Sequence, residues 1–168
     1  MSRIPPSEPT SEPTGPATPQ EPLAGPTQLI SVVAAVARRD QEVLVALRSP
    51  GKRHGGLWEF PGGKVLEGET LHEAVRRELA EELGVGASRV EDPVFRARDP
   101  GSPFLILFIP VQLDGAPRPM EHSALSWRPP SELTGLPLAP SDARFVREYL
   151  LGQGDPSRDQ NDSTRSSS

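Results

Sequence analysis

The 168-residue sequence contains no cysteine, which excludes disulfides, thiolate nucleophiles and zinc-thiolate sites. Lysine is scarce as well, since only Lys52 and Lys64 are lysines among 18 basic residues. No apolar run approaches the roughly eighteen residues that span a bilayer, and the N-terminus lacks the apolar core of a signal peptide. These absences predict a cytoplasmic protein that does not partner with membranes.

Length and charge limit the organisation and the partners. The chain is long enough for one domain with a substantial core, and a net charge of −5 disfavours binding to a nucleic acid polymer. Residues 1–27 and 153–168 are rich in Pro, Ser, Thr, Gly and charged residues, with little to bury. We therefore predict a single domain at residues 28–152 between two disordered tails, as a monomer or a homodimer.

One amphipathic helix stands out in the middle of the chain. Leu71, Val75, Leu79 and Leu83 recur every fourth residue, which places them on one side of a helix. Thr70 followed by Glu73 forms a capping box at its start, and Gly84 suits the turn that ends it. The pattern predicts a helix over residues 71–83.

The same helix carries three carboxylates beside its apolar stripe. Glu78, Glu81 and Glu82 are spaced three and four residues apart, so like charges gather in one small volume. A solvated acidic face is one interpretation. The other is a site for a hard divalent cation, which would turn the repulsion into coordination.

The rest of the domain is mostly strand-like. Residues 28–37 and 43–47 predict two buried strands. Three further strands are predicted: at 90–98, broken by Pro93; at 104–113, with a bulge or edge position at Pro110; and at 125–128. A helical turn is predicted at 131–133, and a helix capped by Ser141 at 142–151. This order predicts an α/β fold in α/β/α layers.

The segment 48–63 is rich in glycine, basic residues and aromatic residues, which is typical of a loop that approaches a ligand. Its positive charge lies near the acidic helix in the sequence. A phosphate group could therefore be held between these basic residues and a metal ion.

A family resemblance sharpens this hypothesis. Gly63, Glu69, Arg77, Glu78, Leu79, Glu81, Glu82, Gly84 and Val85 fit the Nudix box without a mismatch. The chain thus resembles the Nudix hydrolases, whose fold is a mixed β-sheet sandwiched between helices. The resemblance implies that Glu78, Glu81, Glu82 and the Gly63 carbonyl bind Mg²⁺, or Mn²⁺ in its place, with Glu78 also catalytic. It also implies that Arg77 orients a glutamate and that Glu69 supports the loop.

The flanks resemble the MutT-like branch. LWEFPGGK at 57–64 implies that Arg48 and Lys64 contact phosphates, and EHSALSW at 121–127 makes Glu121 a further metal ligand or general base. LPLAPSD at 136–142 makes Asp142 the residue that contacts the base. Asp142 stands where the best-known members have asparagine, and an ionised Asp only accepts hydrogen bonds, so cytidine-type and oxidised guanine substrates both stay open. Phe60 is a candidate for stacking on the base, while His54 and His122 are expected in solvent or behind the site.

These features predict hydrolysis of a nucleoside triphosphate, with a normal, oxidised or modified base, to monophosphate and pyrophosphate. Two alternatives remain. The substrate could be a nucleoside diphosphate derivative such as ADP-ribose or a dinucleoside polyphosphate, or the domain could be a non-catalytic module that binds nucleotides.

Overall fold

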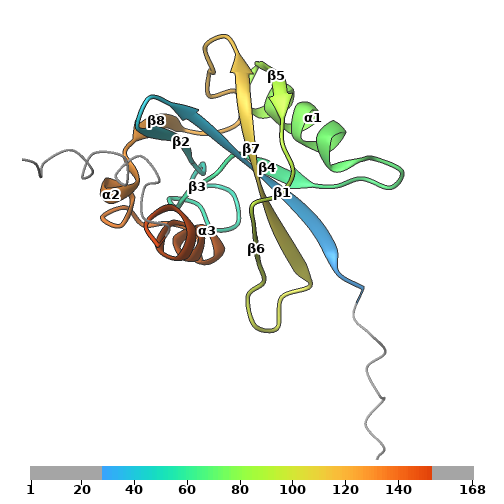
Figure 1. Ribbon diagram of the computed structural model, residues 1–168. Coiled ribbons are helices and arrows are strands. Elements are labelled where there is room, and N and C mark those ends of the chain that lie inside the picture. The colour runs from blue at the N-terminus through green and yellow to red at the C-terminus, as the bar shows by residue number, and fades with distance from the viewer. Residues whose placement is uncertain (1–27, 153–168) are drawn as a thin grey trace, which may run out of the picture.

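A computed structural model describes residues 28–152, and the tails predicted at 1–27 and 153–168 lie outside the described residues. An eight-stranded mixed sheet runs in the order β3-β2-β1-β7-β5, with β4 paired to β1, β6 to β7 and β8 to β2 (Figure 1). The strands are β1 Ile30–Arg39, β2 Glu42–Leu47, β3 Trp58–Glu59, β4 Gly62–Lys64, β5 Gly86–Val90, β6 Phe95–Ala97, β7 Phe104–Asp114 and β8 Ala124–Arg128. The helices are α1 Leu71–Leu83, α2 Pro130–Leu133, α3 Pro140–Phe145 and a π-helix, η1, Val146–Leu150.

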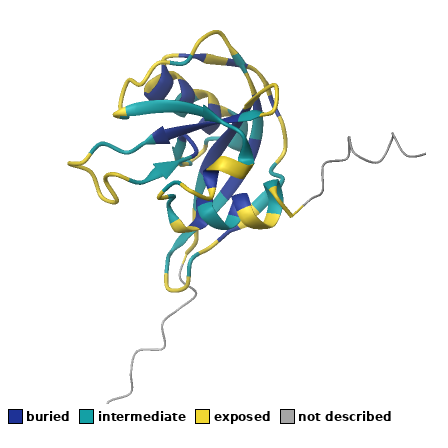
Figure 2. Cartoon of the chain, turned by 90° about the vertical axis from the view of Figure 1, so that its left-hand side faces the viewer, coloured by how far each residue is buried: buried dark blue, intermediate teal, exposed yellow. Residues whose placement is uncertain are grey.

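The long strand β1 divides the interior into two cores. Val33, Ala35 and Ala37 pack with the α1 residues on one face of the sheet, whereas Ala34 and Val36 pack with α3 and η1 on the other. Alternate residues of a strand point to opposite faces, so a strand that is apolar at every position is covered on both. Figure 1 shows α1 on one side of the sheet and α2 and α3 on the other, and Figure 2 shows the buried strands between them. The predicted α/β/α layering is confirmed.

Helix α1 has the ends that its sequence predicts. Thr70 accepts a hydrogen bond from the Glu73 backbone, and the Glu73 side chain accepts one from the Thr70 backbone, which completes the capping box. Gly84 closes the helix in the left-handed conformation at φ 59°. Val75, Leu79 and Leu83 are fully buried.

Three local predictions differ from the structure. The strand expected at 90–98 is indeed interrupted around Pro93, but its first part, β5, begins earlier, at Gly86, and its second part, β6, begins at Phe95. Pro110 lies inside the sheet and not at an edge, because β1 flanks it on one side and the Glu91 N–H donates to its carbonyl on the other. Ser141 does not cap the last helix: Ala139 is the N-cap, and Pro140 occupies the first turn, where its missing N–H costs no hydrogen bond.

Candidate active site

The end of α1 that carries the glutamates faces a pair of glycines in β4. Gly62 and Gly63 pair with Ala34 and Val33 of β1, and this pairing brings their backbone to the helix. The Gly62 N–H donates to Glu82 Oε2 at 3.0 Å. A Cβ on Gly63 would overlap the carboxylate of Glu78. Two carboxylates thus meet the same stretch of backbone, and only glycine allows the approach of Glu78.

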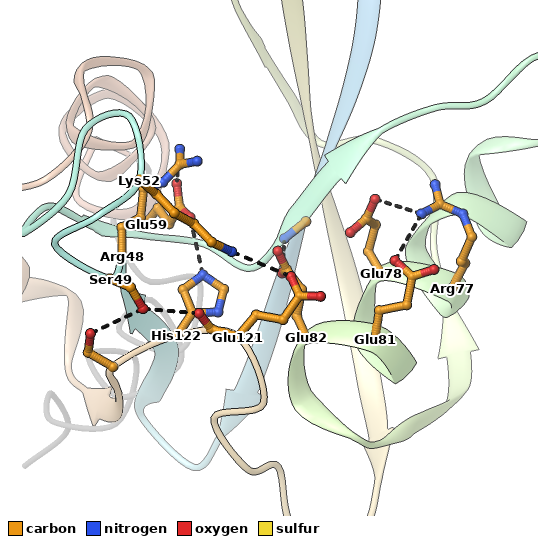
Figure 3. Close-up of polar contacts among 12 residues, drawn as sticks. Arg48, Ser49, Lys52, Glu59, Arg77, Glu78, Glu81, Glu82, Glu121 and His122 are labelled. Carbon is orange, nitrogen blue, oxygen red and sulfur yellow. Dashed lines mark hydrogen bonds and ion pairs between the residues drawn. The ribbon is translucent and has the colours of Figure 1, made fainter.

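Arg77 fastens the loop before the helix to the acidic face. Its Nε and Nη2 donate to the two Glu69 carboxylate oxygens at 2.7 and 3.0 Å, a bidentate pair. Its Nη1 donates to Glu78 at 2.7 Å and to Glu81 at 3.4 Å (Figure 3). Its Nη2 also donates to the Lys64 carbonyl at 2.9 Å. Arg77 thus contacts Glu69, Glu78 and Glu81 directly, and the orienting role of Arg77 and the supporting role of Glu69 stay predictions.

Glu82 is the most buried of the three helix glutamates. It is 9% exposed, and burial raises the pKa of its carboxyl to about 7. The charge of Glu78 raises this pKa further, while His122 and the Gly62 hydrogen bond lower it. Burial beside the Glu78 carboxylate makes the charged form of Glu82 unfavourable. A bound cation would supply the positive charge that stabilises it.

The oxygen atoms of this site are suitable ligands for a divalent cation, although the side chains do not converge on one point. Within residues 28–152 no three carboxylate or imidazole groups converge closely enough to hold a metal ion. Glu78 and Glu81 are turned toward Arg77, so a cation would compete with Arg77 for both. The donors available are hard oxygens: three carboxylates on adjacent turns of one helix and the nearby Gly63 carbonyl. Oxygen donors of this kind suit Mg²⁺ or Mn²⁺.

Glu121 lies in the connection between β7 and β8. The Arg118 and Met120 N–H groups donate to the Leu83 and Glu82 carbonyls, so this segment is fastened to the end of α1. The Glu121 side chain is 46% exposed and lies 3.8 Å from Lys52 Nζ. Its predicted metal or base role stays a prediction, and the structure places it one residue from a direct contact with α1.

A second group of polar side chains faces this segment from β3. Glu59 pairs through Oε2 with Arg48 Nη1 at 3.2 Å and through Oε1 with His122 Nε2 at 3.2 Å. The sequence analysis did not single out Glu59, and it expected His122 in solvent or behind the site. The side chain of His122 is 5% exposed. The sequence held one indication that Glu59 takes part in the site: it stands between the aromatic residues Trp58 and Phe60, and a carboxylate buried between such neighbours requires a partner.

Asp142 and Phe60 are joined through the backbone. The Phe60 N–H donates to Asp142 Oδ1 at 2.7 Å, and both residues are buried. Burial raises the pKa of Asp142 to about 7; the Phe60 hydrogen bond opposes this, and the charge of Glu59 adds to it. Asp142 thus lies behind β3, near Glu59 and Arg48.

The ring of Phe60 belongs to the core. It packs edge-on against Phe108 and Phe145 at centroid distances of 5.9 and 5.2 Å, and the residue is 3% exposed. Stacking on a base would require the ring to leave these contacts, so we do not carry that expectation into the proposed function. Lys64 is exposed, with its Nζ 5.3 Å from the centre of the Phe104 ring.

Comparisons with known proteins agree with this arrangement. The family model described as NUDIX domain matches residues 27–149. The CTP pyrophosphohydrolase of Escherichia coli is 36% identical over 126 residues, which are 73% of this chain and 93% of that protein. A putative 8-oxo-dGTP diphosphatase 2 of Mycobacterium tuberculosis is 37% identical over 123 residues, covering 70% of this chain and 85% of that protein.

Solved structures show the same fold. The solution structure of the E. coli ORF135 protein has a TM-score of 0.65 and 36% identity, covering 77% of this chain and 95% of that one. A MutT NUDIX hydrolase from Burkholderia pseudomallei has a TM-score of 0.64 and 28% identity, covering 73% and 98%. The chain belongs to the Nudix family and is a Nudix hydrolase. The family predicted from the box residues is confirmed. Among the described residues, no helix is long and apolar enough to cross a membrane.

Proposed function

We propose that this enzyme hydrolyses a nucleoside triphosphate to the monophosphate and pyrophosphate in a Mg²⁺-dependent reaction. The observation that carries the proposal is the meeting of Glu78 and Glu82 at the Gly62–Gly63 backbone, where burial and the charge of Glu78 raise the pKa of Glu82. The names of the relatives described above support a triphosphate substrate, and each of them is matched over at least 85% of its length. We further propose a monomer or homodimer that acts on free nucleotides in the cytoplasm.

Each polar group has a part in this proposal. Glu78, Glu81, Glu82, Glu121 and the Gly63 carbonyl would hold the metal, with Mn²⁺ as a substitute for Mg²⁺. The bound cation would supply positive charge that neutralises the phosphates in the transition state.

The chain's own residues do the remaining work. Arg77 holds Glu78 and Glu81 in place through its guanidinium. Arg48 and Lys64 supply positive charge to the phosphates, and Asp142 contacts the base. Glu78 and Glu121 are the two carboxylates we propose as acceptors for the proton of the attacking water. As that water attacks phosphorus, the phosphoanhydride bond breaks and pyrophosphate leaves.

The experiment is a substrate panel with Mg²⁺: CTP, dCTP, 8-oxo-dGTP, the other triphosphates, ADP-ribose and a dinucleoside tetraphosphate. We expect one triphosphate to be cleaved far faster than the rest, with monophosphate and pyrophosphate as products. Turnover of ADP-ribose or the dinucleoside alone would contradict the proposal, and so would silence across the panel from folded protein.

The metal assignment has its own test. Glu82→Gln keeps an oxygen that accepts from Gly62 but removes the carboxylate, and we expect turnover to fall by about 100-fold or more. Substitution of a residue that only hydrogen-bonds to a metal ligand already lowers metal affinity or activity by about 10- to 100-fold. The exposed residue Glu67 gives the matched control, and Glu67→Gln should retain wild-type rates. Unchanged turnover in Glu82→Gln with an unchanged melting temperature would refute the assignment.

A further inference from the structure

The strongest unexplained feature near the site is the imidazole of His122. Its side chain is 5% exposed, and its Nδ1 is a buried polar atom with no hydrogen-bond partner among the described residues. Folded proteins pair nearly all such atoms, because an unpaired buried acceptor loses its hydrogen bonds to water without replacement. An atom of this kind beside an active site calls for a partner, which a bound ligand can supply.

The contacts of Glu59 define what Nδ1 can do. Glu59 is paired with the Arg48 guanidinium at 3.2 Å, so its carboxylate acts as an acceptor, and the hydrogen in its 3.2 Å contact with His122 belongs to Nε2. In the neutral ring the other nitrogen, Nδ1, then carries a lone pair. We assign this tautomer from the hydrogen-bond network. The missing partner of His122 is therefore a donor.

The contact of Nε2 with Glu59 and the fixed backbone on either side of His122 hold the ring in place. The Ser123 N–H donates to the Leu47 carbonyl and the Met120 N–H to the Glu82 carbonyl, both at 2.9 Å, so the backbone is fixed on both sides of His122. Figure 3 shows the ring between Glu59 of β3 and Glu82 of α1. The His122 ring therefore lies between two groups of acidic residues. Glu59 and Asp142 form one group, and the glutamates at the end of α1 form the other.

The charge around His122 narrows the kind of donor. Glu59 and Glu82 lie on either side of the ring, and Glu121 precedes it in the chain. An ionised phosphate only accepts hydrogen bonds, so the partner that donates to Nδ1 is an O–H or N–H group. A nucleotide offers such groups as ribose hydroxyls and as the amino group of a base.

We propose that Nδ1 of His122 accepts a hydrogen bond from an O–H or N–H group of the bound nucleotide, which makes His122 a further substrate-binding residue. The proposal rests on the function proposed above. The contact to Glu59 orients the ring, and the contact to the nucleotide orients the substrate.

Two substitutions separate these contacts. His122→Gln places an amide N–H near the position of Nε2, so it can still hold Glu59, but it has no acceptor near Nδ1. His122→Asn places an amide oxygen near Nδ1 but does not reach Glu59. We expect KM for the preferred triphosphate to rise about three- to tenfold in His122→Gln, the range for one neutral hydrogen bond, with kcat little changed.

We expect a smaller rise in KM for His122→Asn. A residue that merely holds Glu59 would give the opposite order, with His122→Asn the worse enzyme, and that result would overturn the proposal. The matched control is His72→Gln on the partly exposed side of α1, which should leave both constants unchanged. Melting temperatures establish that each variant is folded.

Substrate analogues then identify the donor. The 2′-deoxy and 3′-deoxy triphosphates test the ribose, and an analogue without the amino group tests the base. The analogue that lacks the donor should bind the wild type more weakly, yet bind wild type and His122→Gln equally. If every analogue binds the wild type more tightly than His122→Gln, the donor is not on the nucleotide and the proposal is wrong.

Failure of the two proposals would be distinguishable. Wild-type enzyme that cleaves no triphosphate overturns the proposed function and this inference with it. Wild-type enzyme that cleaves one, alongside a His122→Gln variant with unchanged KM, overturns the inference alone.

Discussion

At the scale of single residues, burial changes what a carboxylate can do. Asp142 lies behind β3 with Oδ1 bound to the Phe60 N–H, and burial raises the pKa of its carboxyl from the usual 3.8 to about 7. Near neutral pH it is a mixture of acceptor and donor, whereas an exposed aspartate would only accept. Base preference can therefore depend on pH at this residue.

The same shift predicts how stability changes with pH. Between about pH 4 and 7 the folded protein holds a proton on Asp142 that the unfolded chain has released. The stabilisation from this group is fully present below about pH 4 and is lost as pH rises through about 7. Asp142→Asn should remove this component, so the melting temperature of metal-free protein should fall less from pH 5 to 8 than in the wild type.

Thermal melts in a chelator at several pH values measure this slope. Asp92→Asn is the matched control, since that side chain is 98% exposed and its removal should leave the slope unchanged. A variant at residue 142 with the wild-type slope would show that the carboxyl is not protonated in the folded state.

At the scale of elements, α1 is a locally encoded helix. Its apolar stripe, capping box and terminal glycine are all confirmed where the sequence predicts them. The acidic side chains stand on its second half, whereas the capping box stabilises its first turn. A substitution at the start of the helix should therefore lower stability without lowering the catalytic rate.

Thr70→Ala tests this separation. Loss of an N-cap side chain costs about 1 kcal/mol, which in a domain of this size lowers the melting temperature by about 2 to 6 °C. Thr70→Ser retains the hydroxyl and should melt like the wild type. We expect kcat to change by less than about twofold in both variants, measured at a temperature where both are folded. A large loss of kcat in a folded Thr70→Ala enzyme would show that the cap also positions the glutamates.

At the scale of the whole molecule, one sheet with a core on each face brings the site together. Strand β1 contributes to both cores, and β4 and β7 pair along it, so the helix end and the glycine pair meet at the sheet. The contacts described above for the site join residues within the described part of the chain, 28–152.

Removing residues 1–27 and 153–168 should therefore leave melting temperature and turnover nearly unchanged, because both segments have few apolar residues to contribute to a core. Melts and kinetics of the 28–152 fragment against the full chain measure this. A drop of several degrees, or a marked loss of turnover, would assign a structural or functional role to a tail.

The sequence by itself determined the features that depend on neighbours along the chain. The helix α1, its caps and the Nudix box are set by residues within one or two turns of each other, and the alternation of β1 predicts a sheet covered on both faces. The family follows from the box because its residues stand at fixed spacing.

Only the tertiary structure decided contacts between distant segments. The pairing of Phe60 with Asp142, the fastening of the 118–120 segment to α1 and the burial of His122 against Glu59 join residues that are 35 or more positions apart. Burial removes water, so partners and pKa values there depend on what packs nearby, which periodicity does not encode. For this reason only the structure shows that the Phe60 ring is buried in the core, which leaves stacking on a base without support. It also shows His122 buried against Glu59, which excludes the expected position in solvent and leaves the one behind the site open.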